Sequence, residues 1–136
     1  MTVSHLGICV TDLERAERFY VGAFGFERLR ELSPPDGVTG TLLQVADPHL
    51  TAVYLGSGSF VLELLHFDRE GNAPYRERSM TEPGLTHISF TVTDLAETCE
   101  RIVELGGEVL RDTDVKAAVL VRDPDGQLLE LVAARR

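Results

Sequence analysis

Two histidines begin the same short pattern at two places in the chain. His5 opens residues 5–13 and His87 opens residues 87–95, and both segments end in Val-Thr-Asp-Leu. Each is followed later by Leu-Glu-Leu, which supplies Glu63 to the first copy and Glu130 to the second. The chain is therefore a tandem duplication, in which each copy provides one imidazole and one carboxylate. Together they form a plausible four-ligand set for one divalent metal ion, whether Zn, Ni, Co, Mn or Fe.

The surroundings of both glutamates favour this interpretation. Glu63 lies within the apolar run Phe60–Phe67 and Glu130 within Leu128–Val132. A buried ionised carboxylate is costly unless it is paired or coordinated, and two facing carboxylates repel unless a cation lies between them. The alternative is that either glutamate points outward and either histidine is an ordinary core residue. Four residues at repeat-equivalent positions favour the metal.

The ligand types also indicate what such a metal would do. No thiolate belongs to the set, which argues against a purely structural zinc site. Two histidines and two carboxylates leave roughly two octahedral positions for water or substrate, as suits a Lewis acid that binds vicinal oxygens and stabilises an enediolate. A carboxylate that detaches can then take a proton from carbon.

Apolar periodicity predicts the same order of elements in both copies, namely a strand, a helix and three strands. In the first copy the helix follows Thr11 as N-cap and stops at Gly25. The strands expected there are 3–10, 26–32, 40–46 continued by 51–55, and 60–67. The second copy predicts a helix over 93–105 and strands over 85–92, 108–111, 117–122 and 127–132.

The fold class expected from this order is α+β, with tandem βαβββ modules forming a cupped, barrel-like mixed sheet and helices outside. The first module covers residues 1–67, a polar linker 68–84 and the second module 85–136, all within one compact domain. Side chains alternate across strands, so the residues on the faces of the four candidate ligands should line a pocket without Lys or Arg. The pocket residues are Cys9, Leu65, Phe67, Ser89, Thr91 and Leu128.

Composition excludes several classes of partner. The net charge of −9 argues against binding to nucleic acid or to an anionic membrane. No apolar run approaches the roughly 20 residues that span a bilayer, and no signal peptide is evident, so a cytoplasmic protein is expected. Cys9 and Cys99 give no disulfide framework, and Cys9 is predicted to be a small buried residue, with a thiol role as the alternative.

The chain resembles the vicinal oxygen chelate superfamily, which includes glyoxalase I, bleomycin-resistance proteins, extradiol dioxygenases and methylmalonyl-CoA epimerase. The resemblance covers essentially the whole chain. It implies that His5, Glu63, His87 and Glu130 are the metal ligands, with Glu130 as the mobile base and Glu63 as the other carboxylate. The residues that carry it are 5–13, Phe19-Tyr20, 24–26, 62–64, 84–87, 92–95, 123–126 and 129–131.

Departures from the family pattern leave the activity open. Bacterial glyoxalase I usually has an Arg and an Asn, which hold glutathione, where this chain has Cys9 and Phe67. The resemblance thus implies a glyoxalase-like metal-dependent lyase or isomerase, of glyoxalase or epimerase type, acting on a small, largely apolar or thiol-adduct substrate. One alternative is a non-catalytic protein that binds a drug or natural product. The other is an extradiol-type dioxygenase, against which Glu63 counts because that pattern needs no equivalent of it. Related chains pair their modules within one chain or across two, so a homodimer is expected.

Overall fold

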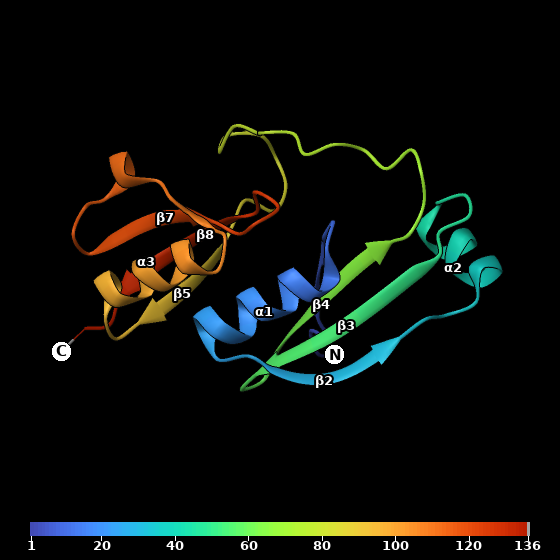
Figure 1. Cartoon of the computed structure of the whole chain (residues 1–136), viewed down its shortest axis with the longest axis horizontal. Helices are drawn as coiled ribbons and strands as arrows, with labels where there is room; N and C mark the ends of the chain where they lie inside the picture. The colour runs from blue at the N-terminus through green and yellow to red at the C-terminus, as the bar shows by residue number, and fades with distance from the viewer. Residues whose placement is uncertain (136) are drawn as a thin grey trace. The chain divides into compact units, whose positions relative to one another are not determined.

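The computed structural model describes residues 1–135 and divides the chain into two compact units. The first unit is Met1–Pro74 and the second is Tyr75–Arg136. Each unit contains one open, four-stranded mixed sheet among its described residues, and neither sheet closes into a barrel (Figure 1). The α+β class and the repeated order of elements are confirmed.

The first unit forms the sheet β1-β4-β3-β2, in which β1 runs parallel to β4 and the other neighbours are antiparallel. Helix α1 contacts β3 and β4. In order along the chain, the elements are β1 (Leu6–Cys9), α1 (Leu13–Phe24), β2 (Glu27–Leu32), α2 (Asp36–Leu43), β3 (Leu50–Ser57) and β4 (Phe60–Phe67).

The second unit repeats this topology as β5-β8-β7-β6, with β5 parallel to β8. Helix α3 contacts β6, β7 and β8. The elements are β5 (Ile88–Val92), α3 (Leu95–Glu104), β6 (Glu108–Val109), the 3-10 turn Arg111–Thr113, β7 (Ala118–Arg122) and β8 (Leu128–Ala133). In both units, the strand that follows the histidine therefore lies directly beside the strand that carries the glutamate.

The central strands of each sheet have one apolar face and one face that carries the candidate ligands. In the first unit the pairs Val53–Leu64 and Leu55–Leu62 are fully buried. Alternation places Tyr54 and Glu63 on the opposite face of the same strands. In the second unit the buried pairs are Val119–Leu131 and Val121–Leu129, and Glu130 lies on the opposite face. A one-residue slip of register would move the glutamates into the apolar face.

Equivalent aspartates begin the two long helices. The Asp12 carboxylate accepts from the backbone N–H of Arg15, and the Asp94 carboxylate accepts from that of Glu97, both at 2.9 Å. The prediction that Thr11 is the N-cap is wrong by one residue, because Asp12 has the extended backbone of a cap and the acceptor oxygen. The helix ends at Gly25 in the left-handed conformation, as predicted.

One predicted strand is wrong. Residues 40–46 were expected to be extended, but Asp36–Leu43 is helix α2. The Thr39 amide donates to the Pro35 carbonyl, and the Thr41 hydroxyl donates to the Gly37 carbonyl, so local contacts offset the weak helix propensity of this segment. The Asp36 carboxylate also pairs with His49 Nδ1 at 2.7 Å, which ties the helix start to the loop before β3.

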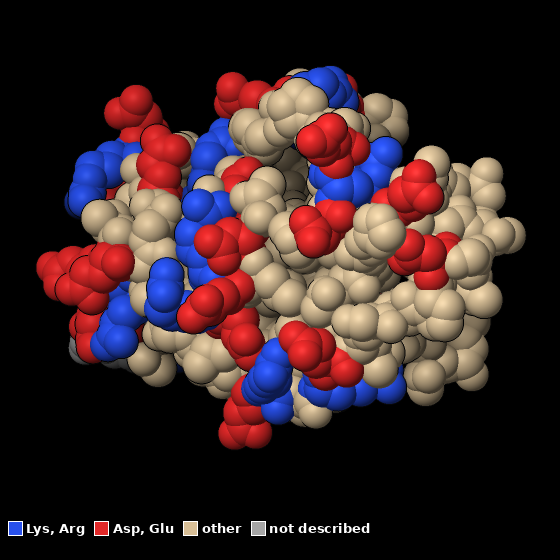
Figure 2. Space-filling model, turned by 45° about the vertical axis from the view of Figure 1, so that its right-hand side comes forward, with Lys and Arg blue, Asp and Glu red and all other residues tan. Residues whose placement is uncertain are grey.

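The last features of the fold concern surface charge and helix length. Acidic and basic side chains lie interspersed on the face shown in Figure 2. Among residues 1–135, no helix is both long enough and apolar enough to cross a membrane.

The two aspartate caps generate a stability prediction. Asp12→Ala removes the acceptor for an otherwise unpaired helix N–H and should lower the free energy of unfolding by about 1 kcal/mol. Asp12→Asn keeps a suitable oxygen and should stay within a few tenths of a kcal/mol of the parent protein. Urea unfolding monitored by circular dichroism measures both. Equal stability of the Ala variant and the parent would show that the Asp12 cap does not contribute to the free energy of unfolding.

Candidate functional site

His5 and Glu63 form a pair on the first sheet. Gly7 is the register partner of Glu63 across the parallel β1–β4 ladder, and His5 lies two residues earlier on the same face. His5 Nε2 lies 3.0 Å from Glu63 Oε2. The Glu63 side chain is only 12% exposed, against 36% for His5. The carboxylate is therefore largely withdrawn from water and has an imidazole nitrogen as a direct neighbour.

The second oxygen of Glu63 is held by Tyr54. The Tyr54 hydroxyl donates to Glu63 Oε1 at 2.8 Å, and both residues are buried. Tyr54 is the register partner of Glu63 on β3, and the guanidinium of Arg30 lies 4.4 Å from the centre of its ring. Burial, and then the hydrogen bond to Glu63, raise the pKa of Tyr54 above its ordinary value. The phenol therefore stays protonated, and able to donate, into the alkaline range.

Gly7 leaves the room that this arrangement needs. A Cβ atom at Gly7 would lie 3.0 Å from Leu65 Cδ1 and 3.5 Å from Glu63 Oε2. A side chain at this position would press on Leu65 and would contact the carboxylate. The glycine thus leaves space on the site face of the sheet for the Leu65 and Glu63 side chains.

His87 and Glu130 form the equivalent pair in the second unit. His87 Nε2 lies 3.7 Å from Glu130 Oε2, and the Ser89 hydroxyl donates to the same oxygen at 2.6 Å. Ser89 and Leu120 are the register partners of Glu130 on the two flanking strands. The Glu130 side chain is 33% exposed, so this carboxylate is more hydrated and more loosely paired than Glu63.

The two histidines are oriented in the same way. The Ser4 hydroxyl lies 2.9 Å from His5 Nδ1, and the Thr86 hydroxyl lies 2.9 Å from His87 Nδ1. In both cases Nε2 is left facing the glutamate. A hydrogen bond at one ring nitrogen fixes the ring and selects the tautomer whose other nitrogen can bind a metal. The sequence contains a signal for this orientation, a hydroxyl-bearing residue directly before each histidine, which the predicted set of site residues does not include.

The structure thus pairs each candidate histidine with the candidate glutamate of its own unit. Within either unit, residues 1–135 contain no larger group of His, Cys, Asp or Glu suited to a metal ion. Among the predicted pocket residues, Ser89 contacts a glutamate directly, whereas Leu65, Phe67 and Leu128 are half-buried and Thr91 is exposed. The prediction that Cys9 is buried is wrong, because it is exposed at the end of β1.

Comparison with known proteins matches nearly the whole chain to one family. The family model of the Glyoxalase/Bleomycin resistance protein/Dioxygenase superfamily matches residues 2–131. A lactoylglutathione lyase of Neisseria meningitidis serogroup A is 30% identical over 146 residues, covering 97% of this chain and 90% of that protein. The chain belongs to the Glyoxalase/Bleomycin resistance protein/Dioxygenase superfamily.

Solved structures agree in fold. A glyoxalase family protein from Bacillus cereus superposes with a TM-score of 0.82 at 19% identity, covering 96% of this chain and 92% of that one. The trypanothione-dependent glyoxalase I of Leishmania major superposes with a TM-score of 0.71 at 26% identity, covering 98% of this chain and 86% of that one.

The unequal surroundings of the two glutamates generate a second prediction. Tyr54→Phe leaves a buried carboxylate oxygen without its donor and should lower the free energy of unfolding by about 1–3 kcal/mol. Ser89→Ala should cost less than about 1 kcal/mol, because water can replace the hydroxyl at the half-exposed Glu130. Urea unfolding at pH 7 compares the two variants. A larger loss in Ser89→Ala would contradict the assigned difference.

The dependence of stability on alkaline pH tests the role of the Tyr54 phenol. Because its folded pKa is raised, the stabilisation from the protonated phenol is present below the unfolded pKa of about 10 and declines as pH rises through and above that value. Between about pH 9 and pH 11, the parent protein should lose stability more steeply than Tyr54→Phe. Parallel slopes for the two proteins would show that the Tyr54 phenol makes no pH-dependent contribution.

Proposed function

We propose that this protein is a metal-dependent lyase or isomerase of glyoxalase type, which moves a proton between carbons next to a carbonyl group. The observation that carries the proposal is the repeated His–Glu pair. In both copies Nε2 faces a carboxylate while a neighbouring hydroxyl holds Nδ1. The similarity to lactoylglutathione lyases supports the reaction class.

The donor atoms fit a divalent metal ion. We propose that His5, Glu63, His87 and Glu130 hold one ion, each pair supplying one nitrogen and one carboxylate. In each pair the free ring nitrogen and a carboxylate oxygen already face one another, and the hydroxyl at Nδ1 provides the outer support typical of metal-bound histidine. Such an ion, whether Zn, Ni, Co, Mn or Fe, would supply Lewis acidity toward the carbonyl oxygen of the substrate.

The two carboxylates suit different roles. Glu63 is buried and accepts a hydrogen bond from the Tyr54 hydroxyl, so its carboxylate is held in one place. This suits a ligand that stays on the metal throughout the reaction. Glu130 is more exposed, lies farther from its histidine and has a hydroxyl donor only from Ser89. A general base must approach carbon and withdraw again, so we assign the proton transfer to Glu130.

The proposed reaction is balanced without an oxidant or reductant. Glu130 takes the proton from the carbon that bears the hydroxyl and sulfur of an α-keto thiohemiacetal, and returns it to the neighbouring carbon. The hydroxyl proton passes from one oxygen to the other. The product is an α-hydroxy thioester with the same atoms, and Glu130 ends as it began, ready for the next turnover.

Metal content provides the first test. Protein purified without chelator or affinity metal should contain about one divalent ion per site. The double variant Glu63→Ala, Glu130→Ala should lose it, because half of the ligands are gone. Inductively coupled plasma mass spectrometry measures the metal content of both proteins. The control variant is Glu82→Ala, which removes a carboxylate outside the two pairs. Equal metal in parent and double variant would refute the ligand set.

Turnover separates the ligand role from the base role. Glu130→Gln keeps an oxygen donor but cannot accept a proton, so it should retain at least part of the metal while kcat falls by roughly two to four orders of magnitude. Thiohemiacetals formed from α-ketoaldehydes and several small thiols are the substrates to screen, with acyl thioesters for the epimerase form of the reaction. Unchanged kcat in Glu130→Gln would remove Glu130 from the proposed role.

A binding protein without catalysis is the second candidate. Cys9 and Phe67 stand where bacterial glyoxalase I usually has glutathione-holding residues, and the second unit contains a cavity of its own. Under this function, small ligands bind stoichiometrically to metal-free protein and no thiohemiacetal is turned over. Loss of all ligand binding on metal removal would favour the enzyme.

We also propose that the protein is a homodimer. Helix α2 leaves Val38 and Leu42, one helical turn apart, 69% and 77% exposed, and adjacent exposed apolar side chains are suited to a protein–protein contact. Light scattering with size-exclusion chromatography should give twice the 15.0 kDa mass of the chain. A concentration-independent mass of one chain would refute association.

A further inference from the structure

The second unit contains a cavity that strand alternation did not predict. Its volume is about 260 Å³, and it lies between the segment before β5 and the start of β8. The pocket expected from strand alternation contained no basic group and was formed by strand faces alone. The residues around this cavity are Tyr75, Arg76, Arg78, Ser79, Met80, Leu85, Thr86, Arg122, Gly126, Gln127 and Leu128.

Charge distinguishes this cavity from the rest of the chain. Its lining contains three arginines and no acidic residue, although the chain has 13 basic and 22 acidic residues. The carboxylates that two of the arginines contact, Glu77 and Glu82, are not among the lining residues. Three guanidinium groups around a small cavity favour an anionic ligand, because their fork geometry matches carboxylate and phosphate oxygens.

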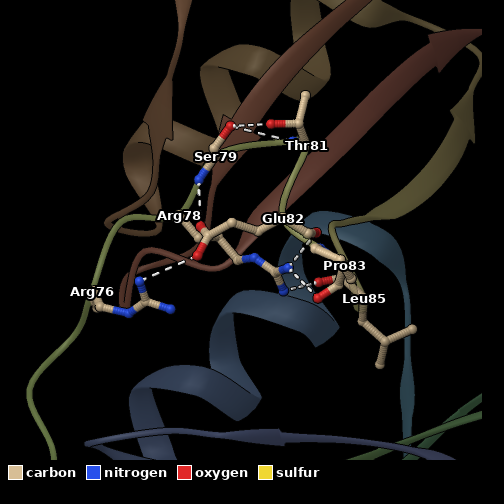
Figure 3. Close-up of polar contacts among 7 residues, drawn as sticks. All are labelled: Arg76, Arg78, Ser79, Thr81, Glu82, Pro83 and Leu85. Carbon is tan, nitrogen blue, oxygen red and sulfur yellow. Dashed lines mark hydrogen bonds and ion pairs between the residues drawn. The ribbon is translucent and has the colours of Figure 1, made fainter.

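Arg78 fixes the loop that forms one side of the cavity. Its guanidinium donates to the carbonyl oxygens of Glu82, Pro83 and Leu85 at 2.7, 3.0 and 2.6 Å (Figure 3). Gly84 permits this packing, because a Cβ there would lie 3.3 Å from both terminal nitrogens of Arg78, and its φ is +129°. The charge of Arg78 meets carbonyl dipoles and, among residues 1–135, no carboxylate within 4.0 Å. The loop is thus built around the guanidinium of Arg78.

Arg122 and Arg76 differ in how firmly they are held. Arg122 donates to the Tyr75 hydroxyl at 2.7 Å and to the Gly126 carbonyl at 3.1 Å, and pairs with the largely exposed Glu77 at 3.0 Å. Arg76 is 76% exposed and has only a 3.4 Å contact with Glu82, seen in Figure 3. Arg76 is therefore able to turn toward a bound anion at little cost to the fold.

Four further lining residues are large apolar or aromatic side chains that are only partly covered. Leu85 is 76% exposed, Tyr75 57% and Met80 48%, and Leu128 is half-buried. Apolar side chains of this size beside a cavity are suited to the hydrocarbon or aromatic body of a ligand. The cavity therefore combines a cationic part with an apolar part.

The cavity adjoins the second His–Glu pair. Thr86 lines the cavity, and its hydroxyl contacts His87 Nδ1. Leu128 also lines it and lies two residues before Glu130 on the same face of β8. A ligand anchored in the cavity would extend along β8 toward the carboxylate.

We propose that this cavity binds a small amphipathic acid. Its carboxylate, phosphate or phosphonate group lies beside Arg76 and Arg122, and its apolar body lies against Leu85 and Leu128. That this acid is the substrate of the His87–Glu130 site rests on the proposed function, whereas its binding does not.

The test uses three probes of similar size on the full-length protein, namely benzoate, phenylphosphonate and the neutral benzamide. Isothermal titration measures affinity, and amide chemical shifts locate the site. The acids should bind and shift the Thr86 and Leu128 amides, and benzamide should bind at least roughly tenfold more weakly. Comparing benzoate with phenylphosphonate identifies the preferred anion. Equal binding of benzamide, or no binding of either acid, overturns the proposal.

Matched variants decide whether the arginines are responsible. Arg76→Gln should weaken acid binding several-fold without loss of fold, and Arg76→Gln with Arg122→Gln by more than about tenfold. Arg101→Gln removes the same charge from the exposed surface of α3 and should leave affinity unchanged. Unaltered affinity in Arg76→Gln and the double variant, or equal losses in Arg101→Gln, refutes the site.

A last comparison separates this inference from the proposed function. Glu130→Gln should still bind the acids, because the carboxylate is not part of the cavity lining. If acids bind through the arginines while the protein contains no metal and turns over no thiohemiacetal, the cavity stands and the enzyme does not. Turnover with no acid binding gives the reverse result.

Discussion

The parallel pairing of β1 with β4, repeated by β5 with β8, is the constraint on which the rest of the structure depends. It places each histidine diagonally beside the glutamate of its own copy, although about 58 residues of chain separate the first pair and 43 the second. The apolar pairs Val53–Leu64 and Val121–Leu129 on the opposite faces hold this register, because a slip of one residue would bury the carboxylates under the helices. The core and the candidate site are therefore two faces of one set of strand pairings.

The two copies reach the same arrangement with different side chains. Glu63 accepts a hydrogen bond from the hydroxyl of Tyr54 on the antiparallel strand β3, while the parallel strand β1 places Gly7 beside it. Glu130 accepts a hydrogen bond from the hydroxyl of Ser89 on the parallel strand β5, while the antiparallel strand β7 places Leu120 beside it. The carboxylate beside Tyr54, that of Glu63, is buried, whereas the carboxylate beside Ser89, that of Glu130, is partly exposed. This difference supports the assignment of a fixed ligand to one glutamate and a mobile base to the other.

The sequence predicted what periodicity and repetition control. The four candidate ligands followed from the duplicated His and Leu-Glu-Leu patterns, and their binding of a metal stays a prediction. Both long helices and the glutamate strands followed from apolar periodicity. Helix α2 did not, because its Val38–Leu43 run lacks a clear helical period and is set by local bonds to Pro35 and Gly37. Tyr54 was not predicted either, because its place opposite Glu63 depends on the exact register of β3 with β4. The arginines of the cavity come from a segment without regular structure and from the end of β7, where alternation gives no guidance.

The exchange of donors between neighbouring strands has a consequence for how such duplicated modules can diverge. Beside each carboxylate, one flanking strand supplies a hydroxyl donor and the other supplies a residue without one. A serine placed at Gly7 would add a second hydroxyl beside Glu63, with its Cβ only 3.0 Å from Leu65 Cδ1, and a tyrosine at Leu120 would add a second hydroxyl beside Glu130. The copies have therefore become non-interchangeable at single positions. Grafting one residue from either copy into the other changes the number of donors, and only the coordinated replacement of both flanking residues preserves it.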